Sequence, residues 1–177
     1  MRIVAGSRKG HRIAAPKGAV TRPTGDRVRE AAFSLIGPVD DATVLDLFAG
    51  SGAMGLEALS RGAASCVFVE RDRDAARVIR ANLEKLRLTG GVVTTRDVAA
   101  ALRDERDRGR RYDLVLVDPP YGEWERQAKT LAELLVAVLA DAALLVVETS
   151  DRVEPELPLD LVTTRRYGSA RLTVFSR

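Results

Sequence analysis

The sequence has few residues of the kinds that build metal centres and disulfide frameworks. It contains one cysteine, Cys66, and one histidine, His11, among its 177 residues. A single cysteine cannot form an internal disulfide, and one cysteine with one histidine cannot make a Cys/His metal site. We therefore expect no metal cofactor and a reducing compartment, the cytoplasm.

Long apolar runs are also missing. One of the longest, Ala142 to Val147, is far shorter than the roughly 20 residues that a membrane-spanning helix needs. The first ten residues, M-R-I-V-A-G-S-R-K-G, contain no apolar segment typical of a secretory signal. With 46% hydrophobic and 30% charged residues, the composition is that of a globular protein outside the membrane, and the length suits one domain.

Negative charge is scarce at the start of the chain. Residues 1–29 contain eight Lys or Arg residues and one acid, a balance of +7, whereas the whole chain carries +3, so residues 30–177 carry −4. A basic segment of this kind suits a polyanionic partner, because each cation placed near a phosphate releases condensed counterions. On charge alone, a flexible solubilising terminus is an equal alternative.

After residue 42, the hydrophobic pattern alternates between strands and helices. Strands are expected at Thr43–Leu47, Ser65–Glu70, Val92–Arg96, Tyr112–Asp118, Leu144–Glu148, Leu161–Arg166 and Arg171–Phe175, and helices at Ala53–Arg61, Asp72–Leu88 and Glu125–Ala140. Repeated strand–helix–strand units predict an α/β fold, with a doubly wound and mostly parallel seven-stranded sheet. The last two strands have no helix between them, which predicts an antiparallel edge strand.

Residues 1–36 are expected to form a basic extension, and residues 37–177 the main Rossmann-like domain, the two folded as one unit. Within the extension, Ile3–Ala5 and Arg12–Ala14 suit a small hairpin, and Asp26–Ile36 an amphipathic helix capped by Asp26. The charged segment Asp104–Arg111 is interpreted as a solvated loop.

A glycine-rich segment, D-L-F-A-G-S-G-A-M-G, follows the first expected strand and opens a helix. Gly50 and Gly52 allow a tight turn and close approach to a ligand, and Gly55 allows close helix–strand packing. Dinucleotide sites share this pattern, with a pyrophosphate at the helix N-terminus. Asp46 would repel a pyrophosphate but attract the cationic amino-acid part of S-adenosylmethionine. A purely structural turn is the alternative.

Acidic residues end the next two expected strands. Glu70 lies 20 residues after Gly50, the spacing at which a carboxylate accepts hydrogen bonds from ribose hydroxyls. Asp97 is a candidate to bind an adenine amino group, with the Val98 backbone N–H available to a ring nitrogen. A helix N-cap is an equally good role for Asp97, and one residue can fill both roles.

The motif D-P-P-Y, Asp118–Tyr121, ends the fourth expected strand. Its two prolines stiffen the loop and leave carbonyls pointing outward. An exocyclic amino group on a base is a poor nucleophile, because its lone pair is delocalised into the ring. Asp118 and the Pro119 carbonyl can accept from its two N–H groups and free that lone pair. Tyr121 offers a face on which a flipped-out base can stack. An ordinary turn is the alternative.

These motifs together resemble the class I S-adenosylmethionine-dependent methyltransferases, and most closely the RsmD family of bacterial 16S ribosomal RNA guanine-N2 methyltransferases. The family's first signature is similar to Arg2–Ile13, its second to R-P-T-G-D-R-V-R-E at Arg22–Glu30, and its glycine segment to Asp46–Ala63. The resemblance is strong over about Arg2–Tyr121 and continues beyond as a strand pattern only. Family members often carry Phe where this chain has Tyr121.

The resemblance implies S-adenosyl-L-methionine as cofactor and a guanine of 16S ribosomal RNA as substrate, within the assembling 30S subunit. The small size of the chain and the lack of an obvious exposed apolar stripe favour a monomer. It places Asp118, Pro119, Pro120 and Tyr121 around the target amino group. It implies a cofactor pocket formed by Asp46, Phe48, Gly50, Gly52, Glu70, Arg71, Asp97, Val98 and Asp118. It implies RNA contacts from Arg2, Arg8, Lys9, Arg12, Arg22, Thr24 and Arg27.

Three alternatives remain open from the residues themselves. D-P-P-Y also serves adenine-N6 methylation, although enzymes that modify DNA usually carry an added recognition domain. Methylation of a protein glutamine is disfavoured by Asp118, since related enzymes have Asn there, and by the basic segment. A non-catalytic RNA-binding or ribosome-assembly module on the same fold is disfavoured by the intact glycine and D-P-P-Y motifs.

Overall fold

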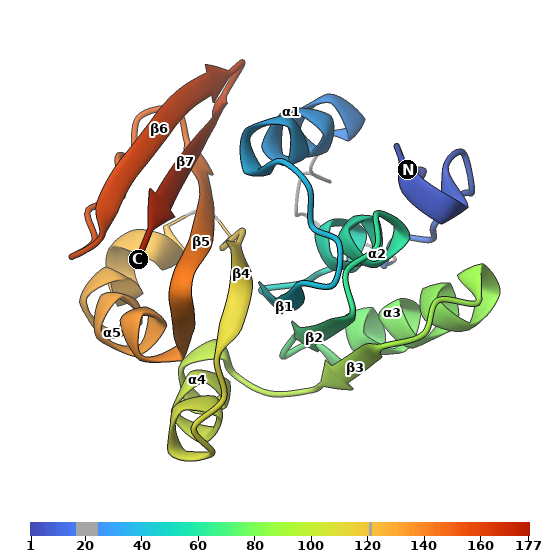
Figure 1. Cartoon of the computed structure of the whole chain (residues 1–177), viewed down its shortest axis with the longest axis horizontal. Helices are drawn as coiled ribbons and strands as arrows, with labels where there is room; N and C mark the ends of the chain where they lie inside the picture. Colours follow the sequence, from blue (N-terminus) through green and yellow to red (C-terminus); the bar gives the residue numbers. More distant parts are fainter. Residues whose placement is uncertain (17–24, 121) are drawn as a thin grey trace.

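Seven strands form one sheet in the computed structural model of the chain (Figure 1), which describes residues 1–16, 25–120 and 122–177. They are β1 (Thr43–Leu47), β2 (Ser65–Val69), β3 (Gly91–Thr94), β4 (Tyr112–Val117), β5 (Leu139–Ser150), β6 (Asp160–Tyr167) and β7 (Ala170–Ser176). The order across the sheet is β3-β2-β1-β4-β5-β7-β6, and β1 to β5 run parallel. The predicted mostly parallel, seven-stranded α/β fold is confirmed.

The antiparallel strand is β7, and it lies one position inside the edge. It pairs antiparallel with β5 on one side and with β6 on the other, so β6 forms the rim. The turn at Gly168, where φ is +63°, joins β6 directly to β7. A hairpin without a helix must reverse direction, and so β7 enters the sheet against the direction of β5.

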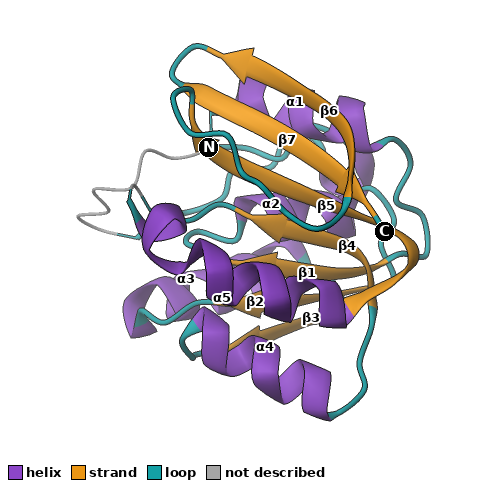
Figure 2. Ribbon diagram, turned by 90° about the vertical axis from the view of Figure 1, so that its left-hand side faces the viewer, coloured by secondary structure: helices purple, strands orange, loops and turns teal. Residues whose placement is uncertain are grey.

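Five helices cover the two faces of the sheet within the described residues. They are α1 (Asp26–Ile36), α2 (Ala53–Ser60), α3 (Arg73–Leu86), α4 (Val98–Asp107) and α5 (Glu123–Val138). The first three lie on one face and the last two on the other, and Figure 2 shows α4 and α5 in front of the sheet. Successive strand residues alternate between the two resulting apolar cores. No helix in the described part of the chain has the length and apolarity to cross a bilayer.

Helix α4 corrects one prediction. We interpreted Asp104–Arg111 as a solvated loop, but Asp104 to Asp107 form the last turn of this helix. Its inner face carries Val98, Ala101, Leu102 and Glu105, at helical spacing. The carboxylate of Glu105 is buried, and it accepts a hydrogen bond from the buried Tyr112 hydroxyl, at 2.5 Å. Because its exposed residues are mostly charged, the amphipathic pattern of this helix was not recognised in the sequence.

The first residues of the chain form a turn that packs against α2. A 3₁₀ turn (Gly6–Arg8) follows the predicted strand Ile3–Ala5. Within residues 1–16 the predicted hairpin is reduced to an isolated antiparallel bridge between Arg2 and Arg12. Backbone N–H groups of Val4 and Ala5 each donate to the buried carboxylate of Glu57, both at 2.8 Å. This contact fixes the turn to the C-terminal half of α2.

Helix α1 has the predicted bounds but not the predicted cap. Gly25 is the N-cap residue, and Asp26 is the first helical residue. The side chain of Asp26 instead accepts a hydrogen bond from Arg29, at 2.9 Å. Arg29 is fully buried, and its Nε lies 3.4 Å from Glu57 Oε2, so it links α1 to α2. A carboxylate one turn away from a buried cation is better placed as its partner than as a cap.

Candidate active site

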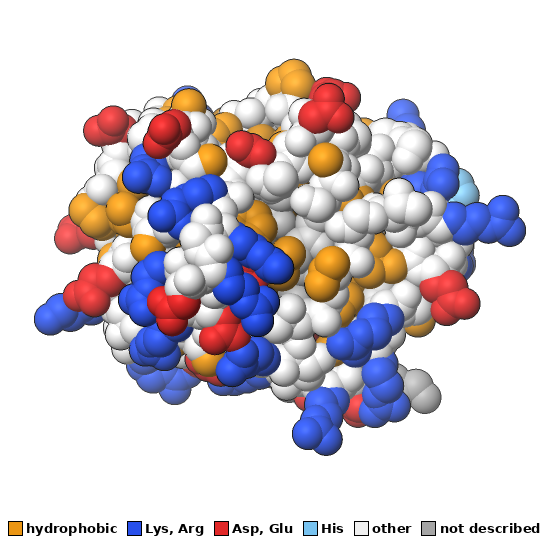
Figure 3. All heavy atoms as spheres, turned by 60° about the horizontal axis from the view of Figure 1, so that its bottom comes forward, with side chains coloured by type: hydrophobic (Ala, Val, Ile, Leu, Met, Phe, Trp, Pro, Cys, Tyr) orange, Lys and Arg blue, Asp and Glu red, His pale blue; other side chains and the backbone are white. Residues whose placement is uncertain are grey.

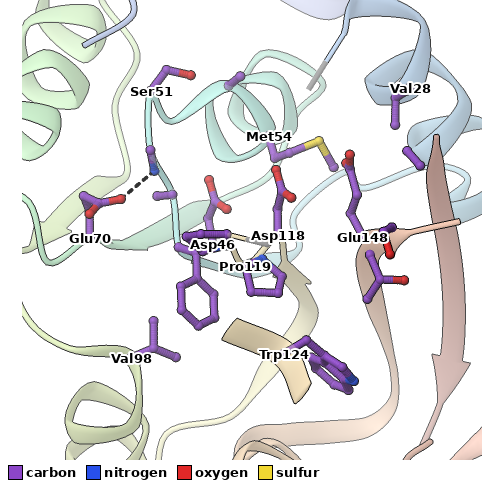
Figure 4. Close-up of a pocket in the computed structure, with 18 of the residues that line it drawn as sticks. Val28, Asp46, Ser51, Met54, Glu70, Val98, Asp118, Pro119, Trp124 and Glu148 are labelled. Atoms are coloured by element: carbon purple, nitrogen blue, oxygen red, sulfur yellow. Dashed lines mark hydrogen bonds between the residues drawn. The ribbon is translucent and has the colours of Figure 1, made fainter. Parts of the chain in front are cut away.

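A cavity of about 960 Å³ runs along the carboxyl ends of the parallel strands (Figure 4). It extends from Asp97 and Val98 at the start of α4, past the ends of β2, β1 and β4, to Glu148 on β5 and the β6–β7 turn. Val28 of α1 and Gly25 just before the helix also line it, and Figure 4 shows Val28 above the sheet. Ligands of open parallel sheets bind at this edge, where the strand order changes direction. Here that change lies between β1 and β4.

The glycine segment forms a tight turn between β1 and α2. Phe48, Gly50 and Gly52 all have positive φ, at 58°, 55° and 78°. A positive φ is strained for Phe48, and such strain is concentrated at functional sites. Phe48 and Gly50 line the cavity, whereas Gly52 does not, since it lies at the N-cap of α2 with its α-carbon facing Ile79.

Gly55 has the packing role predicted for it. A Cβ atom at this position would lie 2.4 Å from Cε1 of Phe68 and 2.6 Å from the sulfur of Cys66. Only a glycine therefore allows α2 to approach β2 this closely. Its backbone N–H also donates to the Asp46 carboxylate at 2.9 Å, which ties the first turn of α2 to the middle of the cavity.

Asp46 is almost completely buried and lines the cavity. Desolvation raises the pKa of its carboxyl to about 8; the hydrogen bond from Gly55 opposes this shift, and the nearby charges of Asp118 and Glu70 add to it. A buried acid in this state gains its charge when a cation arrives beside it. Asp46 is thus placed to respond to a cationic ligand.

Glu70 positions the glycine turn in addition to facing the cavity. Its two carboxylate oxygens accept from the backbone N–H groups of Gly50 and Asp72, each at 2.8 Å. Each oxygen keeps a second lone pair, so these contacts leave the carboxylate able to accept from a ligand. Arg71 beside it lines the cavity, and its Nη1 lies 3.8 Å from Glu123 Oε1.

Asp97 and Val98 lie at the far end of the cavity, where α4 begins. The Asp97 side chain is the N-cap of α4 and accepts from the Ala100 N–H at 3.2 Å, which is the alternative role considered for it. Both residues also line the cavity, Asp97 exposed and Val98 buried. Capping holds Asp97 at the cavity wall and does not remove it from a ligand's reach.

Asp118, Pro119 and Pro120 follow β4 and line the centre of the cavity. The register of β1 on β4 pairs Asp46 with Leu116, so Asp118 lies two residues further along on the same face of the sheet. Figure 4 shows the carboxylates of Asp46 and Asp118 on one side of the sheet and Trp124 on the other. Tyr121 lies outside the described residues.

The predicted RNA-contacting residues lie in two settings. Arg2, Lys9, Arg12 and Arg27 are exposed. Arg8 is half-buried, and its guanidinium donates to the carbonyls of Leu86, at 2.5 Å, and Arg87, at 3.2 Å, at the end of α3. Arg22 and Thr24 lie outside the described residues.

The structure adds residues that the sequence analysis did not select. Glu148, Thr149 and Ser150 at the end of β5, together with Tyr167 and Gly168 of the β6–β7 turn, line the second half of the cavity. A signal for Glu148 was present in the sequence, since it ends an apolar run in the same way that Asp118 and Glu70 do. It was overlooked because no motif surrounds it.

The cavity suits a cationic nucleoside ligand such as S-adenosylmethionine. Carboxylates of Asp46, Glu70 and Asp97 face it from three neighbouring elements, and Phe48 and Val98 supply apolar surface between them. Hydroxyl and ammonium groups donate hydrogen bonds to carboxylates, and a purine ring packs against apolar walls. The volume lies at the upper end of the range for small-molecule sites, which leaves room for a second ligand.

Comparisons with known proteins agree with this geometry. A family model described as "Conserved hypothetical protein 95" matches residues 1–176. The "Putative rRNA methyltransferase YlbH" of Bacillus subtilis is 40% identical, over all of this chain and 99% of its own length. "Ribosomal RNA small subunit methyltransferase D" of Escherichia coli is 39% identical, over 89% of this chain and 78% of its own.

A solved structure is similar over the same extent. The "Putative methyltransferase yhhF" from Escherichia coli has a TM-score of 0.84 and 34% identity, and the match covers all of this chain and 97% of that one. The family model covers nearly the whole sequence, and the two curated relatives are well above 30% identical. The chain belongs to this family, the RsmD family of class I methyltransferases.

Proposed function

We propose that this protein is an S-adenosylmethionine-dependent methyltransferase that methylates N2 of a guanine in 16S ribosomal RNA. One observation carries the proposal: a single cavity joins the glycine turn at Gly50 to Asp118 and Pro119 at the end of β4. A methyl donor bound at the glycine turn and an amino group held at Asp118 and Pro119 would be neighbours. The relative named as a small-subunit ribosomal RNA methyltransferase supports the choice of substrate.

The residues at the end of β4 prepare the target amine. When bound, S-adenosylmethionine supplies an electrophilic methyl group on a sulfonium. Asp118 accepts from one N–H of the target amino group, and the Pro119 carbonyl accepts from the other. These acceptors draw the nitrogen toward tetrahedral geometry before the reaction begins, because the two prolines hold the loop rigidly. The surplus proton leaves after transfer, since the methylated nitrogen is acidic.

The other half of the cavity orients the cofactor. Glu70 binds the ribose hydroxyls, Asp97 and the Val98 backbone bind the adenine edge, and Asp46 attracts the cationic amino-acid part. Phe48, Gly50, Gly52 and Arg71 complete the predicted set, with Gly52 acting through the shape of the turn. Because Glu70 also holds Gly50, cofactor binding and the turn conformation depend on one carboxylate.

Residues 1–36 form the substrate platform in this proposal. Exposed Arg2, Lys9, Arg12 and Arg27 supply phosphate contacts. Arg22 and Thr24, which lie outside the described residues, belong to the same predicted set. The protein acts as a monomer in the cytoplasm, on RNA within the assembling 30S subunit, because so small a chain holds a long RNA poorly without the subunit's own structure. Arg8 contacts RNA in this proposal while its guanidinium stays bound to the end of α3.

The transfer reaction tests the substrate and the reaction together. We expect labelled S-adenosylmethionine to methylate small subunits or 16S RNA, but not duplex DNA or release factors, and mass mapping to locate the methyl group on guanine N2. Methyl groups found on adenine N6, or on DNA or protein, would contradict the assignment of guanine N2 in 16S RNA as the substrate. Cofactor binding without transfer to any of these substrates would favour the non-catalytic assembly module.

Asp118→Ala tests the proposed catalytic residue. We expect transfer to fall by about 100-fold or more, as when one preorganised group that stabilises a transition state is removed. Asp118→Asn is the matched variant, since it retains one carbonyl acceptor but loses the charge. Circular dichroism should show both variants folded. Near-normal rates in Asp118→Ala would assign the acceptor role to another group.

Neutralising Arg22 and Arg27 tests the platform. We expect weaker RNA binding and unchanged cofactor binding. The slope of the logarithm of the RNA-binding constant against the logarithm of the salt concentration should become shallower by about 2. Exposed arginines also gather over α4, on the opposite face of the sheet from α1 (Figures 1 and 3). Arg103→Ala with Arg108→Ala, both exposed there, makes the same charge change away from the platform. Equal losses in the two double variants would mean that only net charge matters.

A further inference from the structure

The second half of the cavity has no role in the reaction described so far. Cofactor and amine contacts account for the end that runs from Asp97 to Asp118. Beyond Asp118 the cavity continues to Glu148 on β5 and to Tyr167 and Gly168 at the β6–β7 turn. A flipped-out base held at Asp118 would extend into this half, and the groups there would contact the rest of the base.

Glu148 lies beside Asp118 in the next strand. Parallel pairing of β4 with β5 places Val117 opposite Val147, and the two acids are the residues that follow. Neighbouring strands are about 4.8 Å apart, which is close enough for both carboxylates to contact one edge of a purine. Both residues are half-buried, and Figure 4 shows their carboxylates on the same side of the sheet.

We infer that Glu148 is a specificity-determining residue that selects guanine, by accepting a hydrogen bond from the ring N1–H while Asp118 and Pro119 hold the 2-amino group. This inference rests on the proposed function, and it names the residue that reads the base. It assigns to β5 a task separate from methyl transfer.

The pattern of donors on the base supports this assignment. Guanine presents its ring N1–H next to its 2-amino group on the Watson–Crick edge, so two adjacent acceptors match two adjacent donors. Adenine has an unprotonated N1 beside its 6-amino group, and a carboxylate facing that lone pair repels it. Unpaired RNA bases are commonly read along this edge. Discrimination by a mismatched buried polar group is stronger than discrimination by shape.

The position of Glu148 in the fold favours a ligand-facing role. In β5 it is opposite Leu172 of β7, and the residue two before it, Val146, lies in the apolar core on the same face. An acid at the end of an apolar strand face directs its charge into the cavity that opens there. Asp46 and Asp118 have the same relation to the core residues Val44 and Leu116.

The test uses a substrate that keeps the amine and removes only the neighbouring ring donor. 2-Aminopurine retains the 2-amino group, but its N1 carries no hydrogen. It can be placed at the target position of 16S RNA by ligation, and the RNA assembled into subunits where the enzyme requires them. Rates are compared for guanine and 2-aminopurine with the wild-type enzyme, Glu148→Gln and the control Glu125→Gln. Glu125 is exposed and lines the same cavity from α5.

We expect wild type and Glu125→Gln to prefer guanine over 2-aminopurine by about 10- to 100-fold, the range for a hydrogen bond to a charged group. In Glu148→Gln this preference should fall to about threefold or less, because a glutamine amide can donate to N1 of 2-aminopurine. The 6-oxygen, absent from 2-aminopurine, affects all variants alike and cancels in the comparison. Cofactor binding should be unchanged.

The outcomes separate this inference from the proposed function. Wild type that methylates guanine, together with a Glu148→Gln variant that keeps the full preference, would overturn the role of Glu148 alone. Equal losses on both bases in Glu148→Gln would show a structural role and overturn it as well. Wild type without activity on any guanine-containing RNA would instead overturn the proposed function.

Discussion

We predict that protonation of Asp46 makes cofactor binding depend on pH. Desolvation, opposed by the hydrogen bond from Gly55 and reinforced by the charges of Asp118 and Glu70, raises the pKa of this carboxyl to about 8. In the free protein, the group therefore holds a proton at neutral pH. An ammonium group bound beside it stabilises the carboxylate, so binding releases that proton and is favoured as the pH rises.

The size of the effect follows from the pKa. With a value near 8, about 1% of Asp46 is ionised at pH 6 and about half at pH 8. If the ligand binds only the ionised form, its affinity increases by about 50-fold over this interval. The sign for folding is opposite: the folded pKa is above the unfolded value of 3.8, so the unfolding free energy of the free protein falls as the pH rises from about 4 to 8.

Calorimetry with S-adenosylhomocysteine measures both the affinity and the proton release. This ligand keeps the amino-acid part without the sulfonium, and its ammonium group remains protonated over the range. Titrations in two buffers of different ionisation enthalpy should give close to one proton released at pH 6.5. Asp46→Asn is the matched control, and its weaker binding should not vary with pH. Wild-type affinity that is equal at pH 6 and pH 8 would refute the assigned role.

Two further predictions concern the support of the site. Gly55→Ala should lower the unfolding free energy by about 1–3 kcal/mol, since the added methyl would lie 2.4 Å from Phe68; urea unfolding measures this, and a change below about 0.5 kcal/mol would contradict the packing argument. Glu57→Ala should cost about 3–5 kcal/mol, because it leaves the buried Arg29 guanidinium without this partner and two backbone N–H groups without their acceptor. Glu57→Gln keeps an acceptor and should cost less, and equal losses would mean that charge alone matters.

Strands and glycine turns could be predicted from local pattern. The bounds of β1 match the expected Thr43–Leu47, and those of α1 match Asp26–Ile36, because each apolar period is uninterrupted. The acids that end β2 and β4 could be found because a strand end in a parallel sheet faces the ligand edge. Gly55 could be identified from its spacing after Gly50.

Features that depend on contacts between distant residues were missed. Helix α4 was missed in part because its charged residues dominate the pattern, and one of them, Glu105, lies on the buried face with the apolar residues. The cap of α1 was wrong because Asp26 pairs with Arg29, whose burial is set by Glu57 on another helix. Glu148 was missed because no motif surrounds it, and its position beside Asp118 follows only from the register of β4 on β5.

An acidic cavity within a chain of net charge +3 determines what part of a nucleic acid can enter it. Asp118 and Glu148 lie side by side at the ends of neighbouring strands, and their carboxylates repel phosphate but attract N–H donors. A base that is flipped out of its helix can enter with its N–H donors while its phosphates stay outside the cavity. The attraction that holds the RNA must then come from basic residues outside the cavity. In the proposed function, binding of the polyanion and chemistry on its base therefore belong to separate surfaces, the first to the basic residues 1–29 and the second to the acidic site.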